Sequence, residues 1–233
     1  MPLILNIETA TSVCSVSLAK DGRRVSSKES GEERSHSEQL TVMIKELLSG
    51  QNMKATDLDA VAVSSGPGSY TGLRIGVSAA KGICYAAGIP LLSVNTLKLM
   101  AKGILKHPDI QTQADHDILL CPMIDARRME VYSALFDMKN ELKREVVAEI
   151  ITENSYTDIL KEKKIAFFGD GSEKCRDIIK NINAVFISGY YPSADDMIPL
   201  SHEAWKQKKY EDIAYFEPFY LKDFIPTVPK KRV

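Results

Sequence analysis

The strongest constraint on the fold is a plan of elements that occurs twice along the 233 residues. Residues 3–7 (LILNI) form an apolar run that ends at Glu8, and residues 13–18 then alternate between two faces. In the second half of the chain, residues 119–124 (LLCPMI) end at Asp125, and the same alternation follows. Apolar runs of this length indicate covered strands, and alternation indicates strands with two different faces. The sequence therefore predicts two copies of one strand-rich α/β unit that face each other across a cleft.

Further strands and helices alternate within each copy. The Asp21-Gly22 turn predicts a returning edge strand over residues 23–30. Apolar residues at helical spacing predict helices over residues 36–48, 73–87 and 96–106, and another that ends near residue 182. Short apolar runs predict strands over residues 58–63, 90–94 and 165–168.

The apolar periodicity lapses near His107, and residues 109–117 are polar with no apolar stripe. A change of this kind is typical of a domain boundary. We therefore expect a first domain over residues 1–106 and a second over residues 107–233. The tail from about residue 213 is expected to pack back on the first domain.

Composition narrows the class of protein. The 30 basic and 31 acidic residues give a net charge of −1, which disfavours independent nucleic-acid binding, because phosphate binding needs a basic face. A role in nucleic-acid binding that is shared with partners stays open. The longest uncharged stretch, residues 82–97, contains Gly88 and Pro90 and is shorter than the roughly 20 residues of a membrane span. The start lacks a signal peptide, and scattered cysteines without a CxxC pair favour a reducing environment. We expect a cytoplasmic protein.

Two carboxylates occupy equivalent positions, Glu8 and Asp125, each at the end of a predicted strand. Such carboxylates can hold a metal–nucleotide complex or act as a base across a cleft. They can equally cap the turns that follow the strands. Both interpretations stay open from the residues alone.

The segment GPGSYTG, residues 66–72, connects a predicted strand to a predicted helix. Backbone N–H groups at such a helix start can hold an anion. However, both GxxxxGK[ST] and GxGxxG are absent, and Arg74 is the nearest cation. A tight, sterically constrained loop is the favoured interpretation.

The helix after this loop has small residues around much of its circumference. Glycine inside a helix costs about 1 kcal/mol relative to alanine, so close approach of another backbone is expected in return. We predict that this helix and the helix over residues 36–48 form a subunit interface. The residues predicted for that interface are Leu40, Met43, Ile44, Leu47, Gly72, Leu73, Gly76, Val77, Ala80 and Cys84.

Metal and nucleophile motifs are weak in this sequence. The histidines give neither HxxxH nor HExxH, and the cysteines form no cluster, so we expect no metal site. Ser69 lies outside a GxSxG motif. The terminal residues 230–232 (KKR) are expected to be a solvated tail, with contact to RNA phosphates as the alternative.

Several segments, in order along nearly the whole chain, resemble the bacterial TsaB family, also called YeaZ. These segments are ILNIETATSVCSVSLAKDG, SSGPGSYTGLRIGVSAAKGICYAAGIPLLSVNTLKLMA, CPMIDARRMEVYSALFD and the closing EPFYLKD. The second is the most specific, and residues 139–189 match least. The positions that carry the family's loop motifs are Glu8, Thr9, Gly66, Pro67, Gly68, Ser69, Thr71, Arg74, Asp125 and Arg127.

The resemblance implies an α/β, actin-like and sugar-kinase-like (ASKHA) fold of two related domains. It also implies a non-catalytic subunit without a cofactor, which activates TsaD in making threonylcarbamoyladenosine beside the tRNA anticodon. TsaD would transfer the threonylcarbamoyl group from threonylcarbamoyl-AMP, and TsaE would be an ATPase partner. The family implies pairing with TsaD, or with a second copy when alone, through helices of the first domain. Contact with tRNA is then expected only through the complex.

Two enzyme functions stand as alternatives. An ATP-dependent phosphotransferase would fit the actin-like fold, but Glu8 is followed by Thr9-Ala10-Thr11, and the missing glycine makes close approach of phosphate harder. A glycoprotease-type peptidase is disfavoured because HxxxH is absent.

Overall fold

The computed structural model describes residues 1–30, 36–112 and 117–221, so the predicted tail at residues 230–232 lies outside the described residues. Its first sheet has the order β3-β2-β1-β4-β5. Its strands are β1 (Leu3–Glu8), β2 (Cys14–Lys20), β3 (Arg23–Ser30), β4 (Ala60–Gly66) and β5 (Leu91–Asn95).

The second sheet repeats this arrangement, with the order β10-β9-β6-β7-β8. Its strands are β6 (Leu119–Asp125), β7 (Glu130–Phe136), β8 (Leu142–Ile150), β9 (Ile165–Phe168) and β10 (Ala184–Ile187). In each sheet the first three strands form antiparallel pairs. The fourth strand pairs in parallel with the first, and the fifth pairs in parallel with the fourth. The predicted duplication of one α/β unit is confirmed, and Glu8 and Asp125 end equivalent strands.

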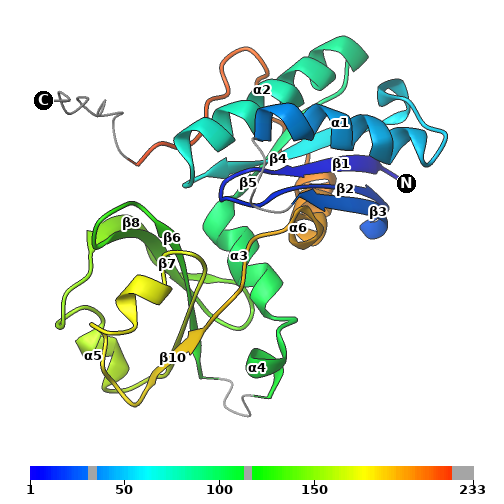
Figure 1. Ribbon diagram of the computed structural model, residues 1–233. Helices are drawn as coiled ribbons and strands as arrows, with labels where there is room; N and C mark the ends of the chain where they lie inside the picture. The colour runs from blue at the N-terminus through cyan, green and yellow to red at the C-terminus, as the bar shows by residue number, and fades with distance from the viewer. Residues whose placement is uncertain (31–35, 113–116, 222–233) are drawn as a thin grey trace, which may run out of the picture.

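Helices cover both faces of the first sheet (Figure 1). On one face, α1 (His36–Ser49) and α2 (Tyr70–Ala87) lie side by side over a core of aliphatic side chains. On the other face lie α3 (Thr96–Ile104) and α6 (Ala194–Lys206), whose core is shared with the second sheet. Two short helices, α4 (Pro108–Gln111) and α5 (Thr157–Leu160), and two 3₁₀ turns, Ala55–Asp57 and Glu173–Cys175, complete the described elements. The helix expected to end near residue 182 is only the second of these 3₁₀ turns.

The last helix, α6, had no counterpart among the predicted elements. It returns the chain to the first sheet well before residue 213, and its N-terminus bonds to the buried polar face of β2. The Ala194 N–H donates to Ser15 Oγ at 2.8 Å, and Ser17 Oγ donates to the Ala194 carbonyl at 3.0 Å. About two turns later, Ser201 Oγ donates to Asn6 Oδ1 at 2.6 Å. The alternating serines of β2 are therefore the attachment surface of α6.

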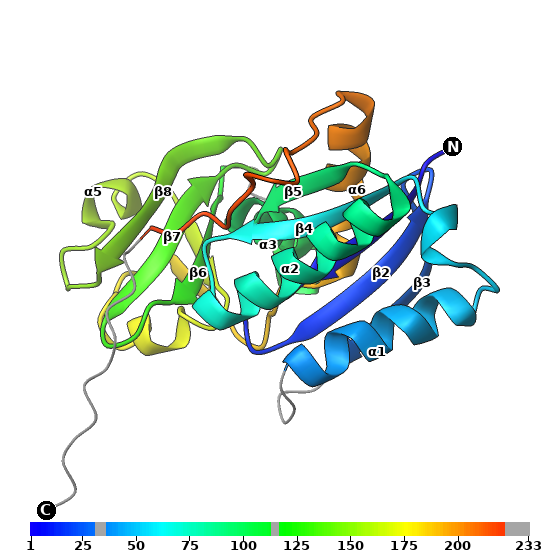
Figure 2. The ribbon, with the colours of Figure 1, turned by 90° about the horizontal axis from the view of Figure 1, so that it is seen from above.

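After α6, residues 207–221 form what we call the C-terminal strap, which runs past β5 and the N-terminal end of α2 (Figure 2). The Glu211 N–H donates to the Leu91 carbonyl at 2.9 Å, and the Phe219 N–H donates to the Ser65 carbonyl at 2.7 Å. Lys81 Nζ of α2 donates to the carbonyls of Ala214 and Phe216. The strap thus lies against the first unit, on the opposite side of α2 from α1.

The glycines of α2 have different surroundings. A Cβ at Gly72 would overlap the Thr9 carbonyl oxygen, and a Cβ at Gly76 would overlap Thr9 Oγ1. A Cβ at Gly82 would meet no atom within 4 Å. The first two glycines therefore allow the turn after β1 to contact the helix backbone, whereas Gly82 faces open space.

We expect Gly72→Ala and Gly82→Ala to change stability in opposite directions. At Gly72 the new methyl group would meet a fixed backbone carbonyl, which should lower the free energy of unfolding by about 1–3 kcal/mol. At Gly82 the same change should raise it by up to about 1 kcal/mol through helix propensity alone. Urea unfolding followed by circular dichroism measures both. Equal effects of the two substitutions would contradict this assignment of the glycines.

Candidate functional site

The ten residues predicted for the partner interface are buried inside the chain itself. The set is Leu40, Met43, Ile44, Leu47, Gly72, Leu73, Gly76, Val77, Ala80 and Cys84. They face the first sheet and the turn after β1, because the apolar stripe of a surface helix packs on its own core. The small size of Gly72 and Gly76 is explained by Thr9 and needs no partner helix. These residues are therefore buried within the described chain, and Leu40 alone among the ten also lines the outward groove described next, so their part in a partner interface stays a prediction.

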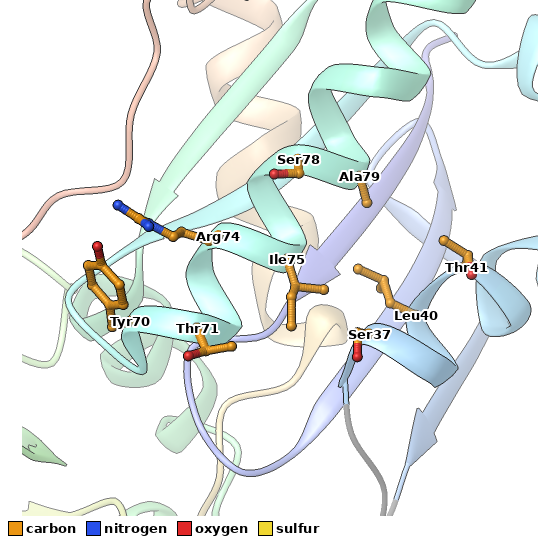
Figure 3. A pocket seen from close by; sticks show the side chains of 9 residues that line it. All are labelled: Ser37, Leu40, Thr41, Tyr70, Thr71, Arg74, Ile75, Ser78 and Ala79. Atoms are coloured by element: carbon orange, nitrogen blue, oxygen red, sulfur yellow. The ribbon is translucent and has the colours of Figure 1, made fainter. Parts of the chain in front are cut away.

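The outward surface of the same two helices carries a groove of about 630 Å³ (Figure 3). Its lining is Ser37, Leu40 and Thr41 from α1, and Tyr70, Thr71, Arg74, Ile75, Ser78 and Ala79 from α2. In Figure 3, Leu40 and Ile75 point toward one another across the groove, while Tyr70 and Arg74 point to the other side of α2. Arg74 is the one charged residue among the nine.

Small exposed residues extend this groove along α2. Thr71, Ser78 and Gly82 are exposed and lie on one helical face, at spacings of seven and four residues. Tyr85 of α2, seven residues after Ser78 on the same face, is 84% exposed, and Val42 of α1 is 50% exposed. A low, weakly charged ridge of this kind allows close approach of another helix. These small residues can be read from the sequence, but they lie on the face of α2 opposite to the apolar stripe.

A second cavity, of about 470 Å³, lies between the two units. The first unit lines it with Ala10, Thr11 and Ser12 of the turn after β1, His36 and Ser37 of α1, and Ser69, Thr71, Gly72 and Ile75 at the start of α2. The second unit contributes Ile124, Asp125 and Asp170. The predicted cleft between the copies is therefore present, with hydroxyl groups on one wall and carboxylates on the other.

The two carboxylates at the strand ends have different surroundings. Glu8 is fully buried, and its Oε1 accepts from the Ala10 N–H at 2.6 Å. Asp125 is exposed in the cleft, accepts from the Arg127 N–H at 2.8 Å, and forms an ion pair with Lys174. Arg127 itself is exposed and has a φ of 69°, in the left-handed region. Each carboxylate thus caps the turn after its strand, and only Asp125 lines the cavity.

The glycine-rich loop is closed by the turn after β1. The Ser69 N–H donates to the Ala10 carbonyl at 2.7 Å, and the Gly72 N–H donates to Ser69 Oγ at 3.2 Å. A Cβ at Gly68 would lie 2.5 Å from the Ala10 carbonyl oxygen. Gly66 has a φ of 105°, and the Gly66–Pro67 peptide bond is cis. This geometry agrees with the favoured interpretation of a tight loop. The Ser69 N–H, which a bound phosphate would need as a donor, already donates to the Ala10 carbonyl.

Two further kinds of feature, a metal site and a membrane-spanning helix, are absent from the described residues. Across residues 1–30, 36–112 and 117–221, no three His, Cys, Asp or Glu side chains lie together in a group that could hold a metal ion. None of the helices in the described part of the chain is long and apolar enough to cross a membrane.

Burial raises the pKa of Glu8 from 4.5 to about 7, because the charged form loses its hydration, and the hydrogen bond from Ala10 offsets this only in part. Its Oε2 is buried without a hydrogen-bond partner among the described residues. Since the folded protein holds this proton more tightly than the unfolded chain, Glu8 adds stability below about pH 4.5. That contribution is lost as the pH rises through about 7.

We expect Glu8→Gln to remove this pH dependence. The unfolding free energy of the variant minus that of wild type should rise by on the order of 3 kcal/mol as the pH increases from about 4 to about 8. Urea unfolding at steps across this range measures the difference, and taking it against wild type cancels the other titrating groups. A constant difference across the range would show that Glu8 ionises as in the unfolded chain.

Comparisons with known proteins agree on one family. The family model described as TsaD, tRNA N6-adenosine threonylcarbamoyltransferase, matches residues 30–224. The tRNA threonylcarbamoyladenosine biosynthesis protein TsaB of Escherichia coli K12 is 30% identical, over 94% of this chain and 94% of that protein. TsaB of Bacillus subtilis 168 is 28% identical, over 94% of this chain and 93% of that protein.

A solved structure, YeaZ from Pseudomonas aeruginosa, has a TM-score of 0.79 at 25% identity and covers 95% of this chain and 100% of that one. Together with the repeated sheet order, this similarity confirms the predicted α/β fold of two related units. The chain belongs to the TsaB family of tRNA threonylcarbamoyladenosine biosynthesis proteins.

Proposed function

We propose that this chain is the non-catalytic partner subunit of a TsaD-family transferase, which it binds through the outward surface of α1 and α2. In this role it activates transfer of threonylcarbamoyl from threonylcarbamoyl-AMP to N6 of the adenosine beside the tRNA anticodon, with a TsaE-family ATPase as third component. The domain division at residues 106 and 107 and the cytoplasmic location stay part of the proposal.

The observation that carries this proposal is the surface formed by α1 and α2. The groove lining has eight uncharged residues and one arginine, and the large side chains of Val42 in α1 and Tyr85 in α2 are exposed on the same pair of helices. The centre of a protein interface is typically depleted in charge and enriched in aromatic residues and arginine. Because both helices rest on a well-filled core, the surface needs no rearrangement before binding.

The same surface supports pairing with a second copy when the transferase is absent. A twofold interface uses one patch on both subunits, so a self-complementary ridge serves equally for a homodimer. We therefore infer that the homodimer and the heterodimer compete for α1 and α2.

The turn after β1 argues against the phosphotransferase alternative. Its Ala10 carbonyl accepts the Ser69 N–H, and Glu8 is buried away from the cavity. The near-neutral charge agrees with tRNA being bound by the complex and not by this chain alone.

We expect tRNA modification reconstituted from the cognate TsaD-family and TsaE-family proteins, threonylcarbamoyl-AMP and tRNA to require this chain. Gly82→Tyr should abolish both modification and association with the TsaD-family subunit, because the ring would stand on the ridge without touching its own core. Nucleoside mass spectrometry measures modification, and light scattering measures association. Lys98→Tyr, on the exposed side of α3, is the control and should change neither.

The substitution Asp125→Ala distinguishes a scaffold function of this chain from a catalytic function. A scaffold should keep full modification activity, since the carboxylate only caps a turn and pairs with Lys174. Loss of modification with association intact would return Asp125 to a chemical role and overturn the proposed function. So would full modification without this chain.

A further inference from the structure

Arg74 lies at the edge of the α1–α2 groove, on the side of the C-terminal strap. Its guanidinium carbon is 4.1 Å from the centre of the Tyr70 ring and 5.8 Å from the centre of the Tyr220 ring. The two ring centres are 5.2 Å apart. Arg74 Nε donates to the Tyr220 hydroxyl at 3.1 Å. Arg74 is therefore held by the face of the Tyr70 ring and by the hydroxyl group of Tyr220, and its two terminal amino groups form no hydrogen bond with a described residue.

This positive charge has no ion-pair partner among the described residues. The other cation of α2, Lys81, is bound by two carbonyl groups of the strap. The remaining groove residues are uncharged. The groove thus presents one exposed cation that forms no ion pair with a described residue, beside an otherwise uncharged lining. The carboxylate of Glu217 in the strap favours the charged form of Arg74 from farther away.

The strap fixes the geometry of this cation. Phe219, next to Tyr220, donates its N–H to the Ser65 carbonyl at 2.7 Å, and the Phe219 carbonyl lies against Gly66, where a Cβ would be 2.8 Å away. An arginine side chain loses considerable conformational entropy when it is ordered on binding. Here that ordering is made before the partner arrives, so the cost of binding is reduced.

We propose that Arg74 is the anchor for a carboxylate, an Asp or Glu side chain of the TsaD-family subunit that docks on α1 and α2. This inference rests on the proposed function and adds the chemistry of the partner surface. The planar guanidinium presents parallel N–H donors that match the two oxygens of a carboxylate. Arginine and tyrosine are also the residues that most often dominate interface energetics. Tyr70 and Tyr220 act as positioning residues for this contact.

A protein carboxylate fits this site better than an RNA phosphate. RNA-binding surfaces gather several cations, because each neutralised phosphate adds to affinity. Here the groove has a single arginine at its edge and eight uncharged residues, on a chain with a net charge of −1.

The test is the dissociation constant for the purified cognate TsaD-family subunit, measured by titration calorimetry at low and at high NaCl concentration. Arg74→Glu should weaken binding at least about tenfold, and the loss should shrink at high salt. Arg74→Lys should recover only part of the affinity, because an ammonium lacks the planar pair of donors. Tyr220→Phe should cost less than Arg74→Glu, since it removes the hydrogen bond to Nε and keeps the ring. Arg23→Glu, at an exposed position on edge strand β3, is the charge-matched control and should leave binding unchanged.

A complementary change in the partner gives the sharpest result. Among single substitutions of exposed acidic residues of the TsaD-family subunit to arginine, one should restore binding to Arg74→Glu, and the others should not. Unchanged affinity of Arg74→Glu, or full affinity of Arg74→Lys, would overturn the inference. So would loss of tRNA binding by the complex with subunit affinity intact. If the wild-type chain does not bind the TsaD-family subunit, the proposed function fails as a whole. If Gly82→Tyr abolishes binding and Arg74→Glu leaves the dissociation constant unchanged, only the anchor is wrong.

Discussion

The contact between the turn after β1 and the start of α2 is the constraint on which the first unit depends. A side chain at Gly68, Gly72 or Gly76 would have no room, because Thr9 and Ala10 occupy the space beside these three glycines. This approach also places Glu8 in a fully buried position, where its carboxyl holds its proton up to about pH 7. One close backbone contact thus sets the orientation of α2, the ionisation of Glu8 and the closure of the glycine-rich loop.

The same contact divides α2 into two surfaces with different tasks. The inner surface carries the large aliphatic residues and the sterically required glycines. The outer surface carries Thr71, Ser78 and Gly82, which nothing in the described chain covers. The strap completes this arrangement by binding Lys81 and holding Tyr220 against Arg74. A helix that is fixed on its inner side, with its outer side low and exposed, is suited to receive another helix.

The two units have kept one topology and diverged at the equivalent strand ends. In the first unit the turn after β1 folds over the start of α2 and takes the Ser69 amide. In the second unit Asp125 stays exposed, held by Arg127 and Lys174. The cavity between them therefore has one closed wall and one charged wall. The shared topology alone does not fix what such a cleft does, since function depends on these local residues.

The sequence by itself determined eight of the ten described strands, the duplicated plan, the helices α1 to α3 and the family, because short-range periodicity and motif spacing are local properties. It did not predict β8 or β10, the two strands at the outer edges of the second sheet. It could not determine which face of α2 meets solvent. Both faces are small or apolar, and only the position of Thr9 shows that Gly72 and Gly76 face inward while Gly82 faces outward. It also missed α6, whose attachment depends on Ser15, Ser17 and Asn6, far away along the chain. The position of the strap beside Arg74 also depends on tertiary structure, because Tyr220 and Arg74 meet only after the chain has passed through the second unit and returned. Tertiary structure alone brings such distant partners together, and it does so through contacts that no local pattern records.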